Sequence, residues 1–121
     1  MYAHIGLHVR DLEAAVRFYE AVLLPLGHRL CSREETSASF GSADDPALYL
    51  YLAKHSAGPG THVALRATER SSVRGFHERG LAAGGKENGA PGVRADYGPS
   101  YYAAFLLDPD GNNVEAVCSG A

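Results

Sequence analysis

Three short stretches of the chain alternate between apolar and polar residues, which is the period of a half-buried β-strand. In each stretch the apolar residues share one face, as Leu7 and Val9 do in the first. If these faces pack under helices, the opposite faces of the three strands line one shared surface. The stretches are residues 4–9, 61–66 and 113–118.

Two longer segments repeat their apolar residues with the period of an α-helix. The first covers residues 12–24 and follows Asp11, which stands where a helix N-cap is expected. The second covers residues 70–83 and contains Gly75 and Gly80. Each glycine weakens a helix by about 1 kcal/mol relative to alanine, so tertiary packing must hold this segment.

The predicted elements occur in the same order in two halves of the chain: a strand, a helix and three further strands. The first module spans about residues 3–53, the second about residues 60–118, and a segment rich in glycine, serine and proline connects them. We therefore expect one α+β domain over residues 1–121, with two βαβββ modules that form a curved mixed sheet, or cup, with helices on its outer face. The remaining strands are expected near residues 29–34, 37–41, 47–52, 85–88 and 101–107.

Composition excludes several classes of protein. A chain of 121 residues can build a core without disulfides or a structural metal. The net charge of -3 and the pI near 6.0 provide no basic stripe, so nucleic acid is not an expected partner. No apolar run approaches the ~20 residues of a membrane helix, and the N-terminal segment does not resemble a signal peptide. Two isolated cysteines, Cys31 and Cys118, favour reduced thiols in a cytoplasmic protein.

Three residues on the polar faces of the alternating stretches, His4, His62 and Glu115, have the composition of a metal site with two histidines and one carboxylate. Such a set binds a divalent transition metal and leaves coordination positions open for a substrate. Each of the six histidines, taken alone, is more often structural or solvated than a ligand. Strand parity distinguishes these three residues, because all of them lie opposite the apolar face of their strand.

Both ends of the chain resemble the vicinal oxygen chelate superfamily, which includes glyoxalase I, extradiol dioxygenases, fosfomycin-resistance thiol transferases and bleomycin-resistance proteins. The opening, residues 4–12, with Phe18-Tyr19 and the helix stop at residues 23–27, is similar to the start of these proteins. Residues 105–115 are similar to the last hairpin of the superfamily, with Asp-Pro-Asp-Gly as the turn. The likeness covers nearly the whole chain in the expected order.

The resemblance implies metal ligands on the first and last strands of each module. His4 matches the first ligand position, His62 the third and Glu115 the fourth. The second position falls on Tyr49, where glyoxalase I usually has a glutamate that transfers protons, and this difference argues against lactoylglutathione lyase activity. The remaining set resembles that of extradiol dioxygenases and fosfomycin thiol transferases, and implies a divalent metal ion such as Fe, Zn, Ni or Mn.

Other residues on the same strand faces are candidates for catalysis or substrate binding. His8 and Tyr49 are the candidate catalytic residues, and His8 is either an acid or base or a hydrogen-bonded histidine without chemistry. Tyr51 either binds substrate or forms an aromatic wall together with Tyr49. Arg66 is either an anion clamp or, as we favour, a solvated charge at the end of a strand.

Residues 86–102 form the least regular part of the chain, because their glycines and prolines argue against a long helix or a central strand. The segment is either a lid or specificity loop over the cup, or a surface connection that its tyrosines anchor. Its candidate substrate-binding residues are Arg94, Tyr97, Tyr101 and Tyr102.

We therefore expect a metal-dependent enzyme, dioxygenase-like or lyase-like, that acts on a small oxygenated molecule. A homodimer is expected because pairing closes the exposed strand edges and because the superfamily usually pairs in this way. The alternative is a metal-free binding or resistance protein that sequesters a small molecule in the same cup. Whether His4 shares a site with His62 of its own chain or of a partner stays open, because both arrangements occur in the superfamily.

Overall fold

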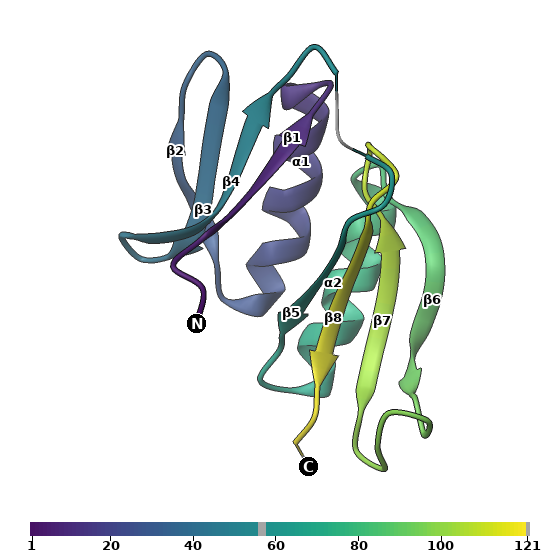
Figure 1. Cartoon of the computed structure of the whole chain (residues 1–121). Helices are drawn as coiled ribbons and strands as arrows, with labels where there is room; N and C mark the ends of the chain where they lie inside the picture. The colour runs from purple at the N-terminus through teal and green to yellow at the C-terminus, as the bar shows by residue number, and fades with distance from the viewer. Residues whose placement is uncertain (56–57, 121) are drawn as a thin grey trace.

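A computed structural model describes residues 1–55 and 58–120 of the chain, arranged as two successive βαβββ modules (Figure 1). In each module a helix packs on one face of a four-stranded sheet. The first module contains β1 (Ile5–Val9), α1 (Leu12–Leu23), the short 3-10 helix η1 (Leu24–Leu26), β2 (Arg29–Arg33), β3 (Ser37–Ser42) and β4 (Asp45–Leu52). The second contains β5 (His62–Arg66), α2 (Arg70–Ala82), β6 (Lys86–Val93), β7 (Tyr102–Leu107) and β8 (Asn113–Cys118).

The two sheets have the same topology. The strand orders are β1-β4-β3-β2 and β5-β8-β7-β6, and in each sheet the first and last strands of the module pair in parallel. The other pairs are antiparallel, so both sheets are mixed. The predicted α+β fold with two βαβββ modules is thereby confirmed. Joining of the sheets into one curved cup stays a prediction, since each module forms its own sheet among the described residues.

The strands turn their apolar faces toward the helices, as the alternation in the sequence predicts. In β1, Leu7 and Val9 are buried while His8 is exposed. In β5, Val63 is buried while His62 is exposed. Buried apolar residues from both sheets and both helices form one hydrophobic core. The histidine-bearing faces therefore lie on the open side of the sheets.

The local sequence explains where α1 begins and how closely α2 packs on its neighbours. The side chain of Asp11 accepts a hydrogen bond from the N–H of Ala14 at 3.1 Å, which makes it the predicted N-cap of α1. A Cβ atom on Gly80 of α2 would lie 2.2 Å from the side chain of Leu106 and 2.8 Å from that of Val22. The glycine that weakens α2 therefore allows it to pack closely on α1 and β7.

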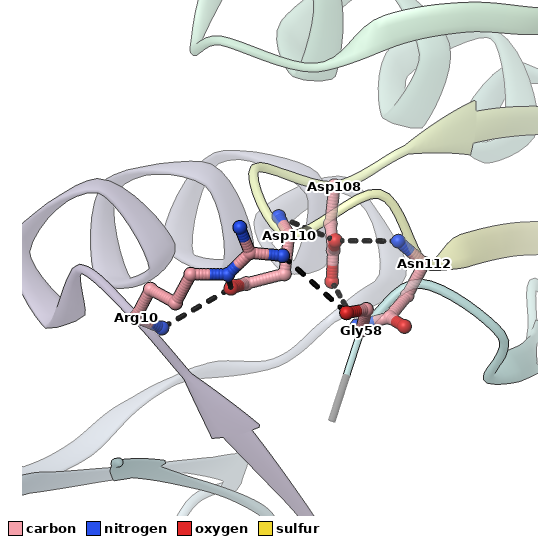
Figure 2. A network of polar contacts seen from close by, with 5 residues as sticks. All are labelled: Arg10, Gly58, Asp108, Asp110 and Asn112. Carbon is pink, nitrogen blue, oxygen red and sulfur yellow. Dashed lines mark hydrogen bonds and ion pairs between the residues drawn. The ribbon is translucent and has the colours of Figure 1, made fainter. Parts of the chain in front are cut away.

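A buried polar network joins the modules at the turn between β7 and β8 (Figure 2). Asp108 accepts hydrogen bonds from the backbone N–H groups of Asp110 and Asn112, each at 2.9 Å, and from the hydroxyl of Tyr19 on α1 at 2.5 Å. Asp110 in turn accepts from the N–H of Arg10 at 3.1 Å. All three turn residues are buried, and a buried carboxylate is stable only with such donors. The Asp-Pro-Asp-Gly turn thus fastens the second module to the first.

The segment predicted to be irregular, residues 86–102, is half strand. β6 pairs with β7, so the strand expected near residues 85–88 is present and extends to Val93, and the irregular prediction was wrong for residues 89–93. The register shifts twice around Gly89, and β6 lies at the sheet edge, where bulges and a proline are tolerated. The irregular part is the hairpin loop of residues 94–101, closed by a hydrogen bond from the N–H of Arg94 to the carbonyl of Tyr101 at 2.7 Å.

Three smaller expectations concern the connection, the cysteines and the membrane. The connecting segment, residues 54–60, includes residues 56 and 57, which lie outside the described residues. Cys31 and Cys118 are both free, and Cys118 is buried. No helix in the described ranges is long and apolar enough to cross a membrane.

Candidate functional site

The side chains of His62 and Glu115 meet on the open face of the second sheet. Nε2 of His62 lies 2.8 Å from Oε1 of Glu115. Ala64 pairs in register with Glu115, so His62, two residues earlier on the same face, reaches the carboxylate diagonally across β5 and β8. The structure therefore brings together two of the three residues proposed as metal ligands.

Glu115 is only 2% exposed although it lies on the open face of the sheet. His62 contacts one carboxylate oxygen, and the hydroxyl of Tyr101 donates to the other, Oε2, at 2.5 Å. Phe105 pairs with Glu115 across β7 and β8. The hydrogen bond to Glu115, together with burial, raises the pKa of Tyr101 to about 12. Tyr101 is therefore a neutral hydrogen-bond donor at physiological pH.

A hollow of about 530 Å³ opens beside the His62–Glu115 pair. The side chain of His62 is 53% exposed and lies at this hollow, which gives a ligand access to its imidazole. The hairpin loop of residues 94–101 forms one wall, where the rings of Tyr97 and Tyr101 pack edge to face at 5.2 Å. The lining residues are His62, Asp96, Tyr97, Tyr101, Phe105 and Glu115.

The open face of the first sheet carries a row of aromatic rings. His4 contacts Tyr49 edge to face with ring centroids 5.1 Å apart, and Tyr51 lies nearly parallel to Tyr49 at 6.0 Å. His8 lies 6.0 Å from Tyr51. A Cβ atom on Gly6 would lie 2.9 Å from the Tyr51 ring, so the glycine leaves room for this ring over β1. The rings of Tyr49 and Tyr51 thus stack side by side on this face.

One chain does not assemble the complete set of predicted metal ligands. The described residues contain no group of three or more His, Cys, Asp or Glu placed to hold a metal ion. His62 and Glu115, both in the second module, supply a nitrogen and an oxygen 2.8 Å apart. His4 belongs to the first module, where it contacts Tyr49. A catalytic metal site uses about three protein ligands. The donors in one chain thus suit a transition metal in kind but fall one short in number.

The side chain of Arg94, a candidate substrate-binding residue, is held by the end of β6, the strand that precedes it. Its guanidinium donates to the carbonyls of Gly92 at 2.9 Å and Ala90 at 2.6 Å. It also lies over the ring of Phe105, 5.4 Å from the centroid. Arg94 therefore supports one wall of the hollow, and it does not belong to the lining.

Two further candidates lie away from the hollow. The hydroxyl of Tyr102 accepts a hydrogen bond from Arg74 of α2 at 3.4 Å, and the guanidinium of Arg70 lies over its ring at 4.9 Å. Tyr102 is thus turned toward the helix side of β7. Arg66 is exposed at the end of β5 and does not line the hollow.

Sequence reasoning missed two residues that line the hollow. Phe105 lies between the buried residues Ala104 and Leu106, so the alternation along β7 could have placed it on the open face. There it is the cross-strand neighbour of Glu115. Asp96 lies in the hairpin loop, where no periodic pattern indicates a direction. Its position depends on how β6 and β7 pair.

Comparison with known proteins identifies a family and several similar structures. The model of the Glyoxalase/Bleomycin resistance protein/Dioxygenase superfamily matches residues 2–116. No curated protein matches the chain significantly. A glyoxalase/bleomycin resistance protein from Albidiferax ferrireducens is 27% identical, with 99% of each chain covered and a TM-score of 0.83.

Two more distant structures share the fold. A glyoxalase-related enzyme from Fulvimarina pelagi is 23% identical, with 98% of this chain and 87% of that one covered and a TM-score of 0.75. A bleomycin resistance determinant encoded on the transposon Tn5 is 20% identical, with coverages of 96% and 95% and a TM-score of 0.66. At these identities the likeness concerns the fold alone.

Proposed function

Because the chain belongs to the Glyoxalase/Bleomycin resistance protein/Dioxygenase superfamily, we propose that it is a metal-dependent enzyme that acts on a small oxygenated molecule. The complete site in this proposal combines His62 and Glu115 of one chain with His4 of a second copy. The observation that supports it most is the His62–Glu115 pair, with its ligand atoms 2.8 Å apart beside an open hollow. In the described part of its own chain this pair has no third ligand.

The arrangement of the modules supports a contribution from a second copy. α1 and α2 pack against each other, so the two modules of one chain associate through their helices (Figure 1). In the described residues, β1 and β5 each end their sheet with one edge that pairs with no other strand. An unpaired edge favours pairing with another chain, and a two-fold dimer satisfies both edges at once. Such a dimer would set the aromatic face of one chain opposite the hollow of the other.

A divalent metal bound there would supply Lewis acidity toward two adjacent oxygens of the substrate. The negative charge of Glu115 would offset the charge of the ion. Tyr49 and Tyr51 would hold the apolar part of the substrate against the aromatic wall. His8, on the same open face, would accept or donate a proton. The hairpin loop of residues 94–101 would exclude water from the hollow. These roles fit a dioxygenase-like or a lyase-like reaction.

A metal-free binding protein is the second candidate, and the aromatic lining favours it. Tyr97, Tyr101 and Phe105 line the hollow, and two further tyrosines lie on the first sheet. Aromatic rings of this kind can hold a ligand without turnover. The metal content of the purified protein distinguishes the two functions, because only the enzyme needs a bound metal ion.

Metal analysis of protein purified without a chelator or a histidine tag tests the proposal. We expect about one divalent ion for each chain in a two-fold dimer, because each dimer has two equivalent sites. Glu115→Gln should release the ion, since it removes the negative charge that offsets it. His55→Ala is the matched control, because His55 is exposed and lies outside the site. Wild-type protein without metal, or a Glu115→Gln protein that retains it fully, would leave the binding protein as the better account.

A further inference from the structure

We propose that Tyr101 is a positioning residue that orients Glu115 and links this carboxylate to the hairpin loop of residues 94–101. Its hydroxyl holds Oε2, so that Oε1 remains beside Nε2 of His62. The inference rests on the proposed function only in taking His62 and Glu115 as metal ligands. The contact between Tyr101 and Glu115 involves protein atoms alone.

The two oxygens of Glu115 have separate partners. Oε1 lies 2.8 Å from His62, and Oε2 accepts from Tyr101 at 2.5 Å. The side chain of His62 is 53% exposed, whereas that of Glu115 is 3% exposed. A half-exposed imidazole at the edge of a sheet constrains the carboxylate weakly, because water can replace its hydrogen bond. The Tyr101 hydroxyl is therefore the contact that selects one orientation of the carboxylate.

Tyr101 also connects Glu115 to the loop that forms one wall of the hollow. Its carbonyl accepts the hydrogen bond from the N–H of Arg94 that closes the loop. Its ring packs on Tyr97, which lies in the loop and lines the hollow. A ligand that displaces the loop must therefore also disturb the hydrogen bond to Glu115. Loop closure and the orientation of the ligand pair are coupled through one side chain.

The chemistry of the contact suits this role. A neutral hydroxyl that donates to a carboxylate fixes its direction without competing for a cation. Partners of this kind orient metal ligands, and their loss lowers metal affinity by about 10–100-fold. Tyr101 acts through Glu115, and nothing in this role requires contact with the substrate.

Tyr101→Phe tests the proposal, because it removes only the hydroxyl and keeps the ring. Tyr102→Phe is the matched control, since the neighbouring hydroxyl bonds to Arg74 on the opposite face of β7. Two quantities are compared with wild type: the affinity for Co(II) from competition titration, and the imidazole nitrogen signals of His62 in NMR spectra of metal-free protein. For Tyr101→Phe we expect a loss of Co(II) affinity of about 10–100-fold and shifted His62 signals. For Tyr102→Phe we expect neither.

The two measurements separate this inference from the proposed function. Unchanged His62 signals and unchanged Co(II) affinity in Tyr101→Phe would overturn the positioning role. Shifted signals in a protein whose wild type binds no Co(II) would support the role and reject the metal site. Glu115→Gln provides a reciprocal variant in case Tyr101→Phe does not fold. In Glu115→Gln, amide exchange in residues 94–101 should become faster. Unchanged exchange would contradict the coupling between the loop and Glu115.

Discussion

Removal of one hydroxyl from the network between the modules should destabilise the whole chain. In Tyr19→Phe, Asp108 loses the donor that comes from α1, while its contacts within the turn remain. Tyr19 is 1% exposed and Asp108 is 3% exposed, so water cannot readily replace the lost hydrogen bond. The change therefore measures how strongly this network holds the two modules together.

The magnitude follows from the number and kind of contacts that Asp108 makes. It accepts two backbone hydrogen bonds at 2.9 Å, one from the Asn112 side chain at 3.3 Å, and that of Tyr19 at 2.5 Å. A hydrogen bond to a charged group contributes about 1.5–3 kcal/mol. Since three donors remain, we expect a loss of about 2 kcal/mol. For a domain of this length that corresponds to a melting temperature lower by about 8 °C.

Urea and thermal unfolding followed by circular dichroism measure this loss. Tyr2→Phe is the control, because Tyr2 is 77% exposed. In an Asp108→Asn background, Tyr19→Phe should cost less than in wild type, since the two residues interact directly. A loss below about 0.5 kcal/mol, or equal losses in both backgrounds, would refute the role assigned to the network.

Two further predictions concern packing and alkaline pH. Gly80→Ala should destabilise the chain by about 1–3 kcal/mol in urea unfolding, because its Cβ would meet Leu106 at 2.2 Å; a gain in stability would show that α2 can shift. The pKa of Tyr19 is raised above its ordinary value of 10.0, mainly by burial and secondly by the negative charge of the neighbouring Asp108. The folded state therefore holds this proton more tightly than the unfolded state. The resulting contribution to stability is complete below pH 10 and is lost as pH rises above it. Melting temperatures across this range should fall less steeply for Tyr19→Phe, and equal slopes would contradict the assignment.

Local periodicity was sufficient to predict the fold, because each element signals itself within a few residues. Alternation located β1, β5 and β8 and identified the open face that carries His62 and Glu115. The prediction failed for the second part of β6, residues 89–93, since Gly89 and its neighbours resemble a loop although the edge of a sheet accepts them. A propensity argument cannot distinguish an edge strand from a loop when the pairing partner is unknown.

The site could be predicted only in part. Alternation along a strand identifies which residues share a face of one sheet, but it does not identify which faces of different sheets lie opposite each other. His62 and Glu115 share a sheet and come together, whereas His4 immediately precedes β1 in the sheet of the other module. The contact of Tyr101 with Glu115 depends on the hairpin loop and the register of β7. The hydrogen bond from Tyr19 to Asp108 joins residues 89 positions apart, and no local pattern reports such a separation.

Complementation between two defective variants tests the shared site most directly. His4→Ala lacks the ligand from the first module, and a His62→Ala, Glu115→Gln double variant lacks the two from the second. A homodimer of either variant alone should not bind metal tightly. After unfolding and refolding together in equal amounts, random pairing should restore about a quarter of the wild-type metal content, because half of the dimers regain one of their two sites. Metal content that stays at the level of the separate variants, although mixed dimers have formed, would contradict a site built from two chains.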